Sequence, residues 1–139
     1  MKKKTITYRD LNKLSNRLAR ILIEKGLGIG SVIGICLDRS FEQVLSILAS
    51  LKIGAIYLPL DPTYPAERLQ YKVNDSQPQC LILQEKFNGI FENEEIEKFS
   101  FSVEELKTSN LSDKKLDFEP NENNLAYIIY TSGSTGRPK

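Results

Sequence analysis

The chain has 139 residues, of which 40% are hydrophobic and 27% charged, and its net charge at pH 7 is +1. This length suits one domain with a modest core, and the composition is typical of soluble globular proteins. The small net charge gives no electrostatic case for a nucleic-acid or anionic-membrane partner, and no stretch is long and apolar enough to span a bilayer.

The first half of the chain begins with alternating helix and strand patterns. Residues 7–10 (TYRD) read as a capping box that opens a helix over 7–25, with Gly26 as its terminator. The nearly continuous apolar run 32–37 predicts a strand buried on both faces, as in a parallel sheet. Ser40, with Gln43 three residues later, caps a second helix over 40–53 that Gly54 ends. Its predicted inner face comprises Val44, Leu45, Ile47, Leu48 and Leu51.

The same alternation continues to residue 83. A second strand is expected over 56–60, and a third over 80–83. Between them, the spacing of Leu69 and Val73 predicts a helix over 65–75 with Pro65 in its first turn. Alternating strands and helices indicate an α/β fold with a mostly parallel sheet and flanking helices.

The stretch from Gln84 to Asn124 is less regular. Residues 102–106 suggest one helical turn, and residues 110–124 read as a polar connector. A final apolar run predicts a strand over 125–130. The glutamates of this stretch are expected to form a solvated acidic face rather than a metal site: Glu92, Glu94, Glu95 and Glu97.

Cysteine and histidine content narrows the chemistry further. Cys36 and Cys80 both lie in apolar runs, so we expect buried thiols in a reducing, cytoplasmic setting, with a disulfide between them as the alternative. The chain has no histidine, which removes the commonest general base and a favoured metal ligand.

The last nine residues combine hydroxyl groups, two glycines and a lysine directly after the predicted strand 125–130. Glycines allow the backbone to approach an anion closely, successive amides can form an anion-binding concavity, and a lysine can reach phosphate oxygens. The residue types alone leave two interpretations open, a nucleotide phosphate loop and a flexible Ser/Gly tail. The spacing matches neither the Walker pattern nor the dinucleotide-binding pattern.

At these residues the chain resembles a known family. Residues 125–139 (LAYIIYTSGSTGRPK) are similar to the phosphate-loop motif of adenylate-forming, AMP-binding enzymes, within the adenylation domains of nonribosomal peptide synthetases. Residues 6–11 (ITYRDL) resemble the family's opening motif, and residues 51–62 (LKIGAIYLPLDP) with 64–69 (YPAERL) resemble its second motif. The resemblance covers nearly the whole chain and is weakest over about 85–119.

The resemblance implies an activity and a set of ligands. The family's complete domain forms an aminoacyl-adenylate from an amino acid and ATP, with Mg²⁺, and releases pyrophosphate. The residues expected to bind the ATP phosphates are Thr131, Ser132, Gly133, Ser134, Thr135, Gly136 and Lys139. No residue of this chain is expected to be catalytic or to ligate a metal.

By the same resemblance, residues 1–139 correspond to the N-terminal part of an adenylation domain, an incomplete subdomain that stops within the phosphate loop. The family's amino-acid pocket, adenine- and ribose-binding motifs and C-terminal lobe are not among these residues. We therefore expect a fragment of an ATP-dependent ligase that is inactive alone. Its expected partners are the remainder of the domain and a carrier protein. The alternatives are a noncatalytic interaction module, or half of a split enzyme, with at most weak phosphate binding.

Overall fold

The computed structural model describes residues 6–92 and 95–116. The predicted strand over 125–130 and the terminal loop lie outside the described residues. Within them, the chain forms α1 (Tyr8–Glu24), β1 (Val32–Cys36), α2 (Phe41–Lys52), β2 (Ile56–Pro59), α3 (Ala66–Ser76), β3 (Cys80–Leu83), the 3₁₀ helix η1 (Glu85–Phe91), β4 (Glu97–Phe99) and α4 (Val103–Thr108). The predicted helices and strands between residues 7 and 83 are confirmed, each within two residues of its expected bounds.

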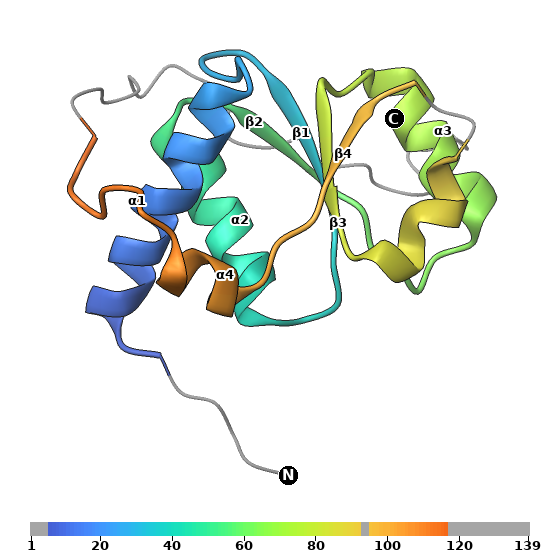
Figure 1. Ribbon diagram of the computed structural model, residues 1–139. Coiled ribbons are helices and arrows are strands. Elements are labelled where there is room, and N and C mark those ends of the chain that lie inside the picture. The colour runs from blue at the N-terminus through green and yellow to red at the C-terminus, as the bar shows by residue number, and fades with distance from the viewer. Residues whose placement is uncertain (1–5, 93–94, 117–139) are drawn as a thin grey trace, which may run out of the picture.

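The four strands form one sheet in the order β2-β1-β3-β4, and every neighbouring pair is parallel. The sheet lies between two layers of helices: α1, α2 and α4 are on one side and α3 is on the other (Figure 1). The predicted α/β class, with a parallel sheet and flanking helices, is therefore confirmed. None of the helices in the described part of the chain is long and apolar enough to cross a membrane.

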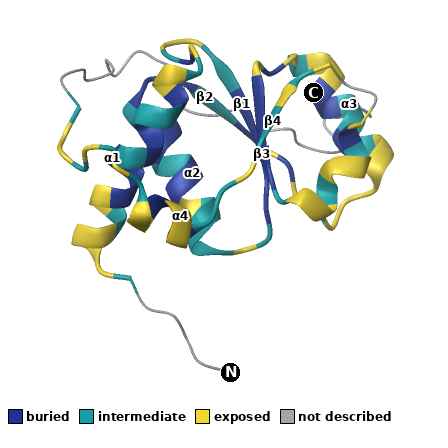
Figure 2. Ribbon diagram, viewed as in Figure 1, coloured by how far each residue is buried: buried dark blue, intermediate teal, exposed yellow. Residues whose placement is uncertain are grey.

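The strands divide their side chains between two hydrophobic clusters, because successive residues of a strand point to opposite faces. On β1, Ile33 and Ile35 join the cluster beneath α1 and α2, whereas Cys36 joins the cluster beneath α3. The central strands are buried in Figure 2, as expected of a parallel sheet covered on both sides. Gly34 fits this tight core, since a Cβ there would lie 2.5 Å from Leu81 Cδ2.

The two cysteines lie on opposite faces of the sheet, since Cys80 belongs to the cluster beneath α1 and α2. Both are buried free thiols. The expectation of buried thiols is confirmed, and the disulfide alternative is wrong.

Helix ends follow the sequence signals closely. The Asp10 amide donates to Thr7 Oγ1 (3.1 Å), and the Gln43 amide donates to Ser40 Oγ (3.2 Å), which confirms both N-caps. Gly26 and Gly54 follow α1 and α2 with φ values of 87° and 77°, a left-handed conformation that glycine adopts without a steric penalty. Pro65 lies at the N-cap of α3 rather than in its first turn.

The predicted inner face of α2 is partly wrong. Val44 and Leu51 are 41% and 37% exposed, whereas Ser46 and Ser50 are buried beside Leu45 and Ala49. Serine can be buried here because each hydroxyl donates to the carbonyl four residues earlier, at 2.8 Å in both cases. These small side chains let the backbone of α2 approach its neighbours, and the bulkier residues turn outward.

The region after β3 contains structure that the sequence analysis did not anticipate. Both η1 and β4 were missed, whereas the predicted turn over 102–106 appears as α4, capped by Ser102. The acidic face is confirmed at Glu92, Glu95 and Glu97, which are exposed; Glu94 lies outside the described residues. Glu97 nevertheless has a partner, because Lys25 Nζ lies 2.5 Å from its Oε2 atom.

Candidate functional site

The predicted phosphate-binding residues lie outside the described part of the chain: Thr131, Ser132, Gly133, Ser134, Thr135, Gly136 and Lys139. Their predicted role in phosphate binding therefore rests on the sequence alone. What the structure does describe is the carboxyl edge of the parallel sheet, where such sheets bind their ligands. Polar residues follow β1, β2 and β3 at this edge.

Segments after β1 and β3 are joined at this edge. The Asp38 amide donates to Gln84 Oε1 (2.8 Å), and Lys86 Nζ lies 2.5 Å from Asp38 Oδ2. The chain leaves β1 toward β2 and leaves β3 toward β4, so these two strands flank the point where the topology switches direction. Asp38, Gln84 and Lys86 therefore bridge the switch point of the described sheet.

A cavity of about 560 Å³ opens beside the ends of β1 and β2. Its apolar walls come from the two strands and from α2, and include Ile35, Ile47 and Tyr57. The charged residues around it are Asp38, Arg39 and Asp61. Apolar walls with a few polar groups are typical of small-molecule sites.

Asp61 follows β2 and is held as a carboxylate. Its Oδ1 atom accepts from the Thr63 amide (2.9 Å) and the Thr63 hydroxyl (2.7 Å). These hydrogen bonds lower the pKa of Asp61, and the nearby cations Lys72 and Arg39 lower it further, although a slight loss of hydration opposes the shift. The carboxylate is thus charged at neutral pH and lies among positive groups.

The start of α3 adds cations at the same edge. Arg68 Cζ and Lys72 Nζ lie 5.2 and 5.1 Å from the centroid of the Tyr64 ring. Burial lowers the pKa of Lys72, repulsion from Arg68 lowers it further, and the charge of Asp61 opposes both effects. Arg39 and Lys72 therefore lie near the Asp61 carboxylate, and Arg68 lies near Lys72, so this edge of the sheet carries three cations that could contact an anionic ligand.

The sequence analysis missed most of these residues as members of a site. Asp61 was read only as part of the family's second motif, and Arg68 only as part of the continuation of that motif. For Arg39 and Asp61 the available signal was their position after an apolar run, since a parallel sheet brings the ends of such strands to a common edge. Across residues 6–92 and 95–116, no group of three or more Cys, Asp or Glu side chains is arranged to hold a metal ion.

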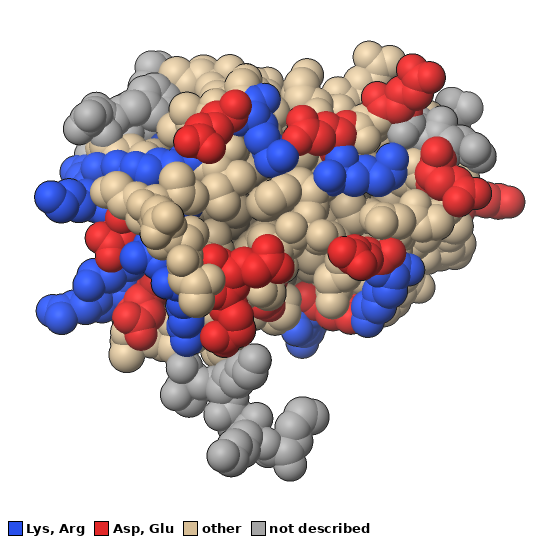
Figure 3. Space-filling model, viewed as in Figure 1, with Lys and Arg blue, Asp and Glu red and all other residues tan. Residues whose placement is uncertain are grey.

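Charge over the rest of the surface is mixed. In Figure 3 acidic and basic side chains are interspersed on the face shown, and basic side chains gather at the left over α1. No extended patch of one sign covers this face.

Comparisons with known proteins agree on one family. The family model described as "AMP-binding enzyme" matches residues 1–139. A dimodular nonribosomal peptide synthase of Bacillus subtilis (strain 168) is 42% identical over 138 residues, which are 96% of this chain and 6% of the synthase. This chain therefore spans only a small part of that relative's length.

Solved structures agree with the sequence comparison. MatB from Rhodopseudomonas palustris, in its ATP-bound crystal structure, superimposes with a TM-score of 0.82 at 25% identity over 98% of this chain and 29% of MatB. The four-domain nonribosomal peptide synthetase AB3403, bound to AMP and glycine, gives a TM-score of 0.74 at 27% identity, covering 92% of this chain and 9% of the synthetase.

Proposed function

The chain belongs to the AMP-binding enzyme family, and on that premise we propose that it is the N-terminal part of an amino-acid-activating adenylation domain of a nonribosomal peptide synthetase. The observation that carries this proposal is the family match over residues 1–139, together with 42% identity to a nonribosomal peptide synthase. The parallel sheet supports it, because its carboxyl edge offers the cations Arg39, Arg68 and Lys72 near the end of β2.

In the proposed reaction, an oxygen of the amino-acid carboxylate attacks the α-phosphorus of ATP. A new phosphorus–oxygen bond forms, the bond from the α-phosphorus to the oxygen bridging the β-phosphorus breaks, and pyrophosphate leaves. Residues 131–139 would hold the phosphates through backbone amides, hydroxyls and Lys139. Mg²⁺ would neutralise phosphate charge. The described residues bring no metal-ligand set together, so we assign it no protein ligand.

The proposed partners are the remainder of the adenylation domain and a carrier protein. The solved relative AB3403 is a four-domain synthetase, which shows the kind of assembly in which a related segment occurs. In such an assembly the chain would supply phosphate contacts, and other segments would supply the amino-acid pocket and the catalytic groups.

We expect the 139-residue chain alone to show no amino-acid-dependent exchange of pyrophosphate into ATP. Stabilising the transition state requires positioned groups around both substrates, and the role proposed for these residues is limited to phosphate contacts. The measurement is exchange of labelled pyrophosphate into ATP with each of the common amino acids, alongside a complete adenylation domain as positive control. Exchange well above background, in material free of contaminating synthetase, would show that the chain is a sufficient enzyme.

Binding of ATP–Mg²⁺ by the chain is expected to be weak and to depend on Lys139. Removing a charged donor to a phosphate costs about 1.5–3 kcal/mol, so Lys139→Ala should weaken binding by about 10-fold or more. Lys13→Ala is the matched control, because Lys13 is exposed on α1. Titration calorimetry or ligand-observed NMR measures the affinities. Equal loss in both variants, or none in Lys139→Ala, would contradict the phosphate role of the terminal loop.

A further inference from the structure

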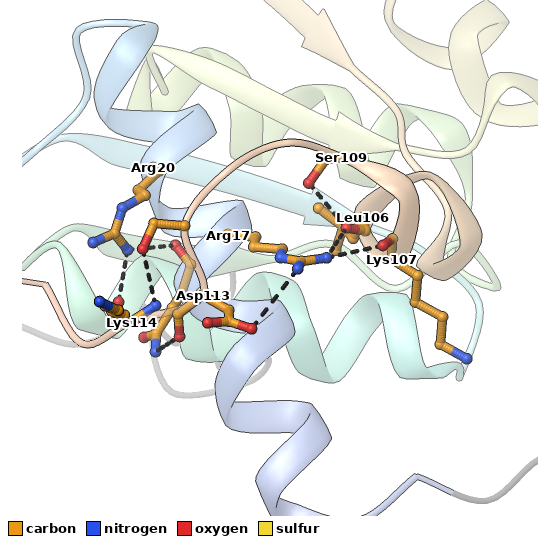
Figure 4. A network of polar contacts seen from close by, with 9 residues as sticks. Arg17, Arg20, Leu106, Lys107, Ser109, Asp113 and Lys114 are labelled. Atoms are coloured by element: carbon orange, nitrogen blue, oxygen red, sulfur yellow. Dashed lines mark hydrogen bonds and ion pairs between the residues drawn. The ribbon is translucent and has the colours of Figure 1, made fainter.

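Polar side chains on one edge of α1 donate hydrogen bonds to main-chain carbonyls of the segment that follows β4. We call residues 106–114 the strap. Arg17 Nη1 donates to the carbonyls of Leu106 (2.8 Å) and Lys107 (3.0 Å), and Arg20 Nη1 donates to the carbonyl of Lys114 (2.8 Å). Arg17 Nη2 also lies 3.7 Å from Asp113 Oδ2. Figure 4 shows both arginines reaching from α1 to the two ends of the strap.

Asn16 connects this set of hydrogen bonds to α2. Its Nδ2 atom donates to the Asp113 carbonyl (2.9 Å), and its Oδ1 atom accepts from Lys52 Nζ (2.7 Å). Lys52 also donates to Asn12 Oδ1 at 2.6 Å. Asn16 is only 2% exposed, so its own two hydrogen bonds are largely shielded from water. The strap, α1 and α2 are thus held by one polar network.

The strap runs along α1 from the carboxyl edge of the sheet toward its amino edge. The Val103 amide, at the start of α4, donates to Glu42 Oε2 in the first turn of α2 (2.9 Å), and α2 follows the carboxyl end of β1. Lys25, at the other end of α1, pairs with Glu97 at the amino end of β4. Asp113 and Lys114 are held beside the middle of α1, by Asn16 and Arg20, so the strap leads from the carboxyl edge part of the way toward the amino edge. Figure 1 shows the same rise of the chain from α4 along α1.

A chain returned to the amino edge can enter a further parallel strand, and a parallel strand ends at the carboxyl edge. The run 125–130, which predicts such a strand, directly precedes the predicted phosphate loop. We infer that Arg17, Arg20 and Asn16 are positioning residues that hold the strap as the return leg of a crossover and thereby direct the phosphate loop to the carboxyl edge. This inference rests on the proposed function.

The expected effects follow from the contacts. Loss of the arginine donors frees the strap, so its amides should exchange with solvent about tenfold faster or more. After loss of both arginines, the strap beyond α4 would be held mainly by the Asn16–Asp113 hydrogen bond and the packing of Leu116. Binding of phosphate would then include the entropy cost of ordering this stretch, so ATP affinity should fall about two- to fourfold.

The test compares wild-type chain with the double variant Arg17→Ala/Arg20→Ala. The control is Arg9→Ala/Lys13→Ala, which removes two exposed positive charges from the same helix. The variant Arg17→Lys/Arg20→Lys keeps both charges but loses the planar guanidinium donors. It replaces the alanine variant in the test if that variant fails to fold. Hydrogen exchange by mass spectrometry reports on the strap, and titration with ATP–Mg²⁺ is done at a temperature where every variant is fully folded.

Support consists of faster exchange confined to the strap and α4, with weaker ATP binding, in the arginine variants alone. Unchanged hydrogen exchange in the strap of the arginine variants would overturn the inference. If the wild type binds ATP, the inference would also be overturned by variants whose strap exchanges faster but whose ATP affinity is unchanged. Absence of ATP binding by the wild type would instead refute the proposed function, and the positioning role with it.

Discussion

Replacing Phe91 with alanine is expected to lower the free energy of unfolding by about 3–5 kcal/mol. Phe91 is the last residue of η1, is 0% exposed and packs into the cluster beneath α3. Truncation removes the apolar transfer energy of the ring and leaves a cavity that the β-strands around it cannot fill. A loss of this size is a large fraction of the stability of a small domain, about 5–15 kcal/mol.

Urea denaturation followed by circular dichroism measures this loss. Val44→Ala is the matched control, since it also truncates an apolar side chain, but one that is 41% exposed on α2. It should change the free energy of unfolding by no more than about 0.5 kcal/mol. Similar effects of the two substitutions would mean that η1 does not close the core.

Neither cysteine should react appreciably with a thiol reagent at pH 8 while the chain is folded. Burial raises the pKa of Cys36 to about 12, and the charges of Asp38 and Asp61 add to this effect. Burial likewise raises the pKa of Cys80 to about 11, with a smaller contribution from Glu97 that Lys25 opposes. The thiolate is the reactive form, and each pKa unit above the ordinary value removes about 90% of it. Labelling should be about 10²–10³ times slower than in the unfolded chain, before restricted access is counted.

Labelling kinetics with and without urea check this expectation, with two thiols per chain reacting in urea. The same shifts set a pH dependence. Because both thiol pKa values are higher in the folded chain, they stabilise the fold fully below the unfolded-chain pKa of about 9. This stabilisation is lost as the pH rises toward 11–12. The double variant Cys36→Ala/Cys80→Ala should lack that part of the alkaline loss. Rapid labelling of either folded-state thiol at pH 8 would show that its strand opens locally.

The elements up to β3 could be predicted because local signals and tertiary packing agree there. Ser40 and Gly54 mark the two ends of α2, and the apolar run of β1 matches a strand covered on both faces. The inner face of α2 could not be predicted by hydropathy. The hydroxyls of Ser46 and Ser50 donate to main-chain carbonyls of their own helix. Only the packed structure shows that the inner face of α2 has room for small side chains.

The remaining misses have a similar cause. β4 has three residues, two of them Glu97 and Lys98, so an alternating apolar pattern has no room to appear. The position of β4 is set by its pairing with β3 rather than by its own sequence. The candidate site was predicted in its terminal loop, where the residue types carry a local signal. The cations Arg39, Arg68 and Lys72 were not predicted as a group, because only the fold brings the end of β1 close to α3.

The grip on residues 106–114 depends almost entirely on carbonyl oxygens, which every amino acid carries. The specific side chains that this contact needs are therefore all on α1. No other side chain has the same hydrogen-bond donors as Asn16, Arg17 and Arg20 at these positions. Along the strap, substitutions at exposed positions such as Lys107 should be nearly neutral, whereas a polar residue in place of the buried Leu106 should destabilise the fold. Sequence changes at such exposed positions should leave the path of the strap intact, because the carbonyl groups that α1 contacts belong to the main chain.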